Sequence, residues 1–207
     1  MTAGGSRPQP PRRWLACPWA FSEWLLAPWA FSERLLAYRV SAVPSERFVE
    51  ALNDQIGREF NAAHQYTALA AYYDRLTFPR LAKFFFAQAE EERGHAMKMV
   101  EYLRDTGAEL RLGEVAAPRT DFPDHVEPIR LALESERKVT VAISAIYEIA
   151  RETNDYASES FMQWFVDEQV EEESTMEDLL QVAERVREYP MMLEEFLARD
   201  GGELGGE

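Results

Sequence analysis

Cysteine and basic residues are both scarce in this chain of 207 residues. Cys17 is the only cysteine, so neither a disulfide framework nor a thiolate metal cluster can form within one chain, and a reducing cytoplasm is the expected location. Lys and Arg number 22 against 37 Asp and Glu, which gives a formal net charge of −15. Because phosphate binding requires a basic surface, we expect no nucleic-acid partner, and cations are the natural ligands.

Long apolar runs and strand-like segments are also missing. No run of about 18 apolar residues occurs, so we expect no transmembrane helix and no membrane partner. Hydrophobic residues make up 46% of the chain and charged residues 29%, a balance that is typical of a folded globular domain. Since no segment reads as a strand, the expected fold class is all-α.

Helical periodicity and breakers predict five helices. Pro79 favours the start of one helix and Gly107 the end of it, while Asn154 and Asp155 indicate a tight turn followed by a cap. The expected helices cover residues 45–74, 79–105, 124–152, 156–188 and 191–199.

The segment 107–123 determines the expected topology. It contains two glycines and two prolines and reads as a loop. A helix of about 27 residues is about 40 Å long, and a loop of about 17 residues can extend about 55 Å, so this loop can cross the whole bundle. The sequence therefore predicts an up-down-down-up four-helix bundle with one long crossover loop and a short C-terminal fifth helix.

The two ends of the chain differ from the predicted bundle. Residues 18–27 read PWAFSEWLLA and residues 28–37 read PWAFSERLLA, a tandem copy with one difference. We expect residues 1–43 to be either a disordered leader or residues ahead of the true translation start. The folded domain is expected over 44–200, and 201–207 reads as a flexible acidic tail.

A carboxylate interrupts the inward stripe of each long helix near its middle. Steps of four and three residues define stripes that are apolar at both ends and contain, in chain order, Glu59, Glu92, Glu136 and Glu172. One buried glutamate is often a paired structural charge, but four at the same height repel one another and are costly without cations. No lysine or arginine lies on the four stripes, so two divalent metal ions are the expected counter-charge.

The remaining polar residues on the stripes narrow the choice of metal. His95 stands three residues after Glu92, and Gln169 stands three before Glu172. Oxygen ligands with one imidazole and no thiolate suit iron or manganese better than structural zinc. Ferritin-like bundles place one Glu on each of two helices and Glu-x-x-His on the other two, so the fourth helix here departs by offering Gln169-x-x-Glu172.

At this point the chain resembles the haem-free bacterial ferritins. The segments REFNAAHQY, EEERGHA and FMQWFVDEQVEEE carry the resemblance, which covers residues 44–200. It implies an iron storage protein that assembles as a homo-oligomer of twenty-four chains, oxidises Fe²⁺ with O₂ or H₂O₂, and deposits ferric mineral in a hollow shell. The implied ferroxidase centre consists of Glu59, Glu92, His95, Glu136, Gln169 and Glu172. A third iron site is implied at Glu91, Glu168 and Glu171.

The roles of single residues near these motifs can be interpreted in two ways. Tyr66 lies on the inward stripe two turns after Glu59; it is either a core tyrosine or, as the resemblance implies, an electron donor beside the iron. Trp164 is read mainly as packing. His64 and His125 are expected at the surface or at a helix start rather than as ligands.

Alternative functions predict different ligands. Haem bacterioferritins place a haem-binding methionine between the Glu and the His of the second helix, where this chain has Arg93 and Gly94, so no haem is expected. Di-iron oxidases, oxygenases and rubrerythrin-like peroxidases share the ligand set, although rubrerythrins add a Cys-rich domain. A purely structural bundle would bind no metal.

Overall fold

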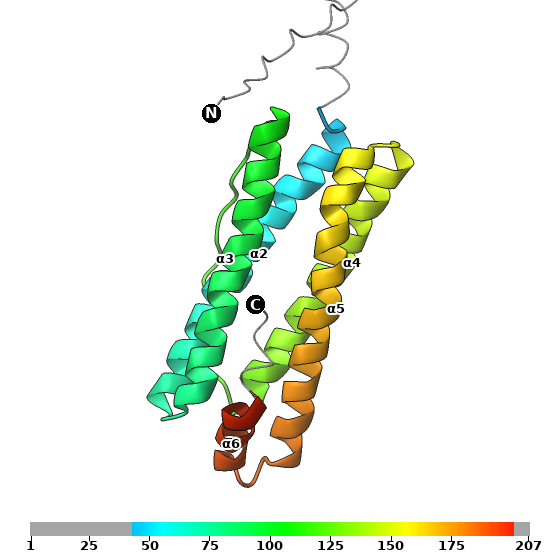
Figure 1. Cartoon of the computed structure of the whole chain (residues 1–207). Coiled ribbons are helices and arrows are strands. Elements are labelled where there is room, and N and C mark those ends of the chain that lie inside the picture. The colour runs from blue at the N-terminus through cyan, green and yellow to red at the C-terminus, as the bar shows by residue number, and fades with distance from the viewer. Residues whose placement is uncertain (1–42, 201–207) are drawn as a thin grey trace, which may run out of the picture. The chain divides into compact units, whose positions relative to one another are not determined.

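Five helices make up the described part of the chain, residues 43–200 of a computed structural model (Figure 1). They are α2 (Glu46–Arg75), α3 (Pro79–Thr106), α4 (Glu127–Glu152), α5 (Tyr156–Arg185) and α6 (Met191–Asp200). The predicted all-α class and the five predicted helices are confirmed. None of these helices is both long and apolar enough to cross a membrane. The predicted leader and tail fall outside residues 43–200, apart from Val43.

Most helix ends lie where the sequence signals place them. Ser45 and Asp155 cap α2 and α5 by accepting hydrogen bonds from the backbone N–H groups of Phe48 and Ser158. Gly107 ends α3 with a φ of 72°, a left-handed conformation that glycine adopts without steric cost.

Two boundaries differ from the prediction by three residues, and the others by at most one. Helix α4 begins at Glu127 rather than at 124, because the Asp124 side chain accepts hydrogen bonds from the N–H groups of Val126 and Glu127 and so stands just before the helix. Helix α5 ends at Arg185, three residues earlier than predicted.

The N-terminus of α3 is capped by a residue distant in sequence. Phe78 at the cap position makes no side-chain hydrogen bond, and Pro79 opens the helix. The buried carboxylate of Glu194 in α6 instead accepts hydrogen bonds from the N–H groups of Arg80 at 2.9 Å and Leu81 at 3.0 Å. Helix α6 therefore packs against α3 with a charge that suits the helix dipole.

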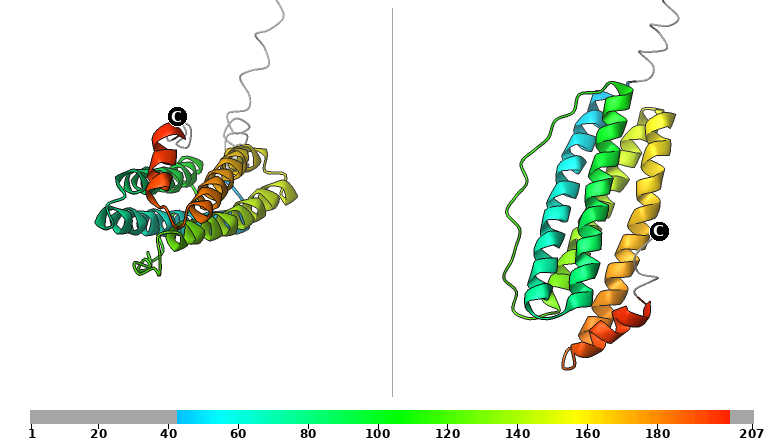
Figure 2. Two further views of the ribbon diagram at one scale, coloured as in Figure 1. Left: turned by 90° about the horizontal axis from the view of Figure 1, so that it is seen from below. Right: turned by 60° about the vertical axis from the view of Figure 1, so that its left-hand side comes forward.

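The crossover predicted between the third and second long helices is confirmed. Helices α2 and α3 form one antiparallel pair and α4 and α5 the other, while residues 107–126 run along the bundle beside α2 (Figure 2). Three amide side chains of α2 bind this segment. Asn53 accepts from the N–H of Arg111, Asn61 accepts from the N–H of Ala116, and Gln65 exchanges two hydrogen bonds with the backbone of Arg119.

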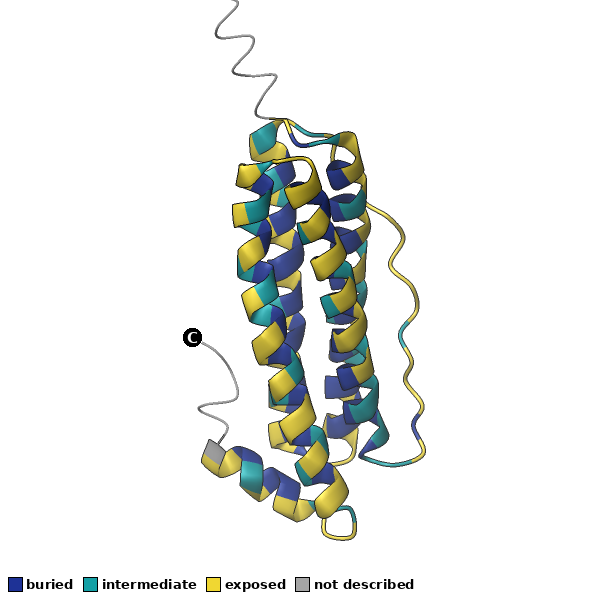
Figure 3. Cartoon of the chain, turned by 90° about the vertical axis from the view of Figure 1, so that its right-hand side faces the viewer, coloured by how far each residue is buried: buried dark blue, intermediate teal, exposed yellow. Residues whose placement is uncertain are grey.

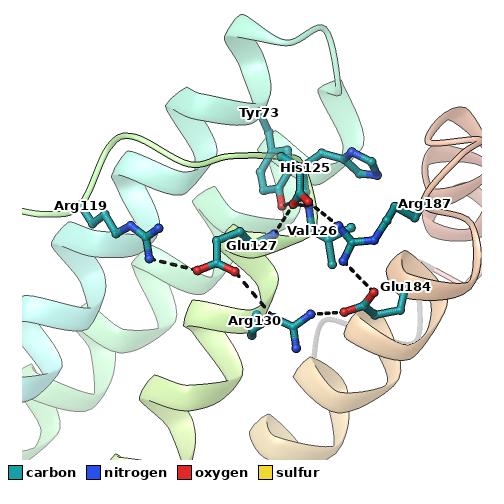
Figure 4. A network of polar contacts seen from close by, with 9 residues as sticks. Tyr73, Arg119, His125, Val126, Glu127, Arg130, Glu184 and Arg187 are labelled. Carbon is teal, nitrogen blue, oxygen red and sulfur yellow. Dashed lines mark hydrogen bonds and ion pairs between the residues drawn. The ribbon is translucent and has the colours of Figure 1, made fainter.

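The end of the crossover is fixed by alternating charges. Arg119 binds Glu127, Glu127 binds Arg130, and Arg130 binds Glu184 of α5 (Figure 4). Arg187 completes this network of ion pairs by binding Glu184 and the Asp124 carboxylate. Several partly exposed pairs in one network tie the start of α4 to the end of α5, although each pair alone contributes little.

The bundle interior consists of two apolar clusters. Dark blue buried positions line the inner faces of the long helices, and exposed positions lie outside (Figure 3). One cluster contains Tyr73, Phe85 and Leu179 and reaches α6, and the other contains Phe48, Leu52 and Phe165 at the opposite end. The buried polar residues from the middles of the four stripes lie between them, as the sequence predicts.

Candidate metal centre

Each long helix contributes to a buried polar layer. Glu59 comes from α2, Glu92 and His95 from α3, Glu136 from α4, and Gln169 and Glu172 from α5. Every one of these six side chains belongs to a residue that is at most 6% exposed. The structure therefore buries all six residues that the sequence predicts for the dinuclear centre.

Two overlapping groups of ligand atoms bring the layer together. One oxygen or nitrogen from each of Glu59, Glu92 and His95 lies within 4.8 Å of the others, and the same holds for Glu92, Glu136 and Glu172. Because Glu92 belongs to both groups, it stands between two adjacent positions that could each hold a cation. A carboxylate shared by two metal positions is what the predicted dinuclear centre requires.

Two carboxylate oxygens in the layer are left without partners. Oε2 of Glu59 and Oε2 of Glu136 are buried, and neither has a hydrogen-bond partner among the described residues. The Oε1 atoms of the same two groups are bound, by Gln55 Nε2 at 2.8 Å and by the Tyr66 hydroxyl respectively. Unpartnered buried oxygens are costly, so the residues present fit metal ions that take these lone pairs as ligands.

The carboxylates also lack a protein counter-charge. Among residues 43–200, no lysine or arginine forms an ion pair with any of the four buried glutamates. Burial, together with the charges of neighbouring carboxylates, raises the pKa of Glu136 to about 7 and that of Glu172 to about 10. Burial, followed by the charges of Glu59, Glu136 and Glu172, holds the pKa of Glu92 well above its usual value. The metal-free layer therefore retains protons that bound cations would displace.

His95 is neutral and in place for coordination. Its Nδ1 lies 3.7 Å from Glu92 Oε2 and 3.5 Å from Glu172 Oε1. Burial and, to a lesser extent, the charge of Lys98 together lower the pKa of the imidazole to about 4. Neutral imidazole is the form that binds metals. The imidazole packs edge-on against the indole of Trp164. That indole also contacts Phe165 and the Lys98 ammonium, which lies 3.4 Å from the centroid of the indole.

Tyr66 is attached directly to the layer. Its hydroxyl donates a hydrogen bond to Glu136 Oε1, and its ring packs against Phe85. Burial, with the charge of Glu136 next, holds the pKa of the phenol well above its usual value, so the proton stays on the tyrosine. The structure thus places Tyr66 beside the predicted centre, and its role in electron transfer stays a prediction.

The residues predicted for a third iron site are only partly brought together. Among the described residues, Glu91 shares a group of close ligand atoms with His95 and Glu172, while Glu168 and Glu171 belong to no such group. Burial raises the pKa of Glu91, and the charges of Glu168 and Glu171 raise it further, so the three carboxyl groups do influence one another. The third site stays a prediction.

Several polar side chains around the layer are not among the predicted ligands. Gln55 donates to Glu59, Gln88 donates to Glu91 at 2.6 Å, and Thr140 contacts Gln169. The spacings of Gln55 to Glu59 and Gln88 to Glu91 are i,i+4 and i,i+3, which is a signal that the sequence offers. The contact between α4 and α5 at Thr140 has no such local signal.

The fold and the buried layer are typical of one class of protein. In this class, carboxylates from four helices and an imidazole from one of them form a metal site inside a helical bundle. Comparison with known proteins gives the family. Residues 49–186 match the family described as Ferritin-like domain. Because this match covers more than half of the chain, the chain belongs to the ferritin-like family.

Named relatives and solved structures agree. The chain is 40% identical over 161 residues to ferritin BfrB of Mycolicibacterium smegmatis, which covers 78% of this chain and 89% of that protein. It is 44% identical over 142 residues to a bacterial non-heme ferritin of Staphylococcus aureus, which covers 69% of this chain and 86% of that protein. An open pore ferritin of the archaeon Archaeoglobus fulgidus superposes with a TM-score of 0.73 at 32% identity over 81% of this chain and 99% of that one.

Proposed function

We propose that this chain stores iron by oxidising Fe²⁺ at the buried layer and depositing ferric oxyhydroxide inside a shell of identical chains. One observation carries the proposal: four buried glutamates and a neutral histidine gather in the core, and within residues 43–200 no lysine or arginine is ion-paired with these glutamates. Membership of the ferritin-like family supports the same function. Fe²⁺ is the substrate, and O₂ or H₂O₂ is the oxidant.

The ligands divide between two positions. Glu59 and His95 would hold one Fe²⁺, Glu136 and Glu172 would hold the other, and Glu92 belongs to both groups. Gln169 contacts Glu172 and would add its amide oxygen to the second position once the amide is turned. The carboxyl groups release their protons when the cations bind. Two divalent cations then match the charge of the four carboxylates. Oxidation of two Fe²⁺ supplies two electrons, which together with two protons convert one O₂ to H₂O₂.

The remaining residues tune this chemistry. The Tyr66 hydroxyl orients the Glu136 carboxylate, and this bond to a proposed iron ligand supports a role for Tyr66 as an electron donor. Gln169 supplies a neutral oxygen where a second histidine is common in related bundles, so one position binds less tightly and its product is released more readily. Glu91, Glu168 and Glu171 form an auxiliary iron site beside the centre.

A di-iron enzyme with an organic substrate is the alternative function. The position of the cavity described below favours iron storage instead. A cavity of about 890 Å³ lies between α2, α4 and the crossover and touches Tyr66. Its lining includes none of the six residues of the dinuclear centre. An oxygenase needs substrate space at the metal itself.

Assembly and location follow from the family. We infer a homo-oligomeric shell of twenty-four chains in the cytoplasm, without nucleic-acid or membrane partners. The shell is required for storage, because a mineral core needs an enclosed volume.

The double substitution Glu92→Ala with His95→Ala tests the centre. It removes the shared carboxylate and the imidazole, so rapid oxidation of Fe²⁺, followed by stopped-flow absorbance of the ferric product, should be lost. Electron microscopy should show that assembled particles remain. The matched control Glu90→Ala changes an exposed residue of the same helix and should oxidise Fe²⁺ like the wild type. Wild-type oxidation rates in the double variant would refute the assignment.

A further inference from the structure

Thr140 is a polar residue on the inward stripe of α4 that has no part in the ligand set. It stands one turn after Glu136. Its Oγ1 lies within hydrogen-bond distance of three oxygens: the Glu136 carbonyl at 3.1 Å, Gln169 Oε1 at 2.9 Å, and Glu173 Oε1. A hydroxyl carries one proton and accepts through two lone pairs, so Thr140 is surrounded by more acceptors than it can satisfy.

The Gln169 amide is the neighbour that can relieve this excess. As drawn, its Nε2 donates to Glu172 Oε2 and its Oε1 faces Thr140. A half-turn of the amide exchanges the two atoms within the same space. Nε2 then donates to Thr140 Oγ1, and the Thr140 hydroxyl donates its proton to Glu173. The Thr140 hydroxyl proton then has one acceptor, and one N–H of the Gln169 amide binds Thr140.

The half-turn also decides whether Gln169 can bind a metal. An amide nitrogen carries two hydrogens and offers no lone pair, whereas the amide oxygen is a ligand for hard cations. A cation between Glu136 and Glu172 repels the amide hydrogens and attracts Oε1. Glu173 is suited to accept the Thr140 proton. Arg137 Nε lies 4.0 Å from Glu173 Oε2, so Glu173 Oε1 is left for Thr140.

We propose that Thr140 and Glu173 are positioning residues that hold the Gln169 amide with its oxygen toward the second metal position. The proposal rests on the proposed function, since it concerns the same dinuclear centre. It identifies a relay, Gln169 to Thr140 to Glu173, that compensates for the missing second histidine. Histidine would fix its ligand atom by its own ring geometry, whereas glutamine requires an outside partner to select oxygen over nitrogen.

Binding of Co²⁺ to the full-length assembled protein tests the relay without any oxidation. Thr140→Val removes the hydroxyl and keeps the branched shape. Loss of a partner that orients a metal ligand typically weakens metal binding about 10–100-fold. Calorimetry should therefore show the weaker of the two Co²⁺ ions bound at least about tenfold less tightly, with a changed visible absorption spectrum. Thr140→Ser should restore both, and Glu173→Ala should weaken the same ion.

Thr67→Val is the matched control. The Thr67 hydroxyl also donates to the carbonyl four residues earlier, that of Ala63 at 2.9 Å, but Thr67 is exposed on α2 and touches no ligand. Its Co²⁺ binding should equal that of the wild type.

Three results would overturn the relay. Thr140→Val could bind both Co²⁺ ions within twofold of the wild type, or Thr67→Val could lose as much affinity as Thr140→Val. If Thr140→Val does not fold, the relay is overturned when Glu173→Ala binds both Co²⁺ ions within twofold of the wild type. Wild-type protein that takes up fewer than two Co²⁺ per chain at the centre would overturn the proposed function as well, which separates the two failures.

Discussion

Removal of metal should give this protein an inverted dependence of stability on pH. The pKa of Glu136 is about 7 in the folded chain against 4.5 for an ordinary glutamate, and burial is the main cause. Between these pH values the folded chain holds a proton that the unfolded chain has released. Raising the pH therefore favours unfolding, and the contribution of Glu136 is fully present below pH 4.5 and lost as the pH passes 7.

The size of the effect follows from the shift. One pKa unit corresponds to about 1.4 kcal/mol, so Glu136 alone should lower the free energy of unfolding by about 3 kcal/mol between pH 5 and pH 8. Glu172, with a pKa of about 10, extends the decline to higher pH. Most proteins instead gain stability as the pH rises from 4, because paired carboxylates ionise.

Denaturant unfolding of chelator-treated protein at several pH values measures this directly. Glu136→Gln keeps an oxygen for the Tyr66 hydroxyl and cannot ionise, so it should remove about 3 kcal/mol of the decline. Glu148→Gln, an exposed change on the same helix, should leave the decline intact. Saturating Co²⁺ should abolish it, because bound cations displace the protons. A stability that rises with pH in the metal-free wild type, or equal slopes for wild type and Glu136→Gln, would refute the reasoning.

Three further predictions concern the auxiliary site, haem and backbone entropy. Replacing Glu168 and Glu171 by alanine should change the ratio of iron oxidised to oxygen consumed and the later phase of uptake, while the first two-iron oxidation stays; loss of that initial burst would place both residues in the primary centre. The purified protein should show no Soret band and should turn amber as ferric mineral accumulates, whereas a Soret band at about one haem per two chains would indicate a bacterioferritin-like haem site. Gly94→Ala should raise the free energy of unfolding by about 1 kcal/mol, because a Cβ there meets no atom within 4 Å; an unchanged or lower value would show that the glycine is needed.

Local signals were sufficient for most of the fold and for the buried layer. Pro79, Gly107 and Asp155 act through their own backbone or side chain on the nearest residues, so their effect can be read from the chain. The six residues of the buried layer could be predicted because a polar residue on an apolar stripe is conspicuous at a period of 3.6 residues.

Contacts between residues that are distant in the sequence could not be predicted from local signals. Glu194 reads as an ordinary acidic residue of a short helix, yet it caps α3 from more than a hundred residues away. Asn53 and Gln65 belong to no motif that indicates a partner, yet they bind the crossover. Such roles depend on which segments the fold brings together, and nothing near these residues in the sequence signals the partner. The auxiliary site is different, since its residues come from the family resemblance alone.

The amount of iron retained per chain tests the central claim most directly. Metal-free protein is supplied with Fe²⁺ in air in repeated additions, separated from unbound iron by gel filtration, and assayed for iron and protein. An iron store should retain far more than two iron atoms per chain, within particles that electron microscopy shows to be filled with mineral. Retention of about two atoms per chain would indicate a di-iron enzyme, and retention of none a structural bundle; either result would contradict the account.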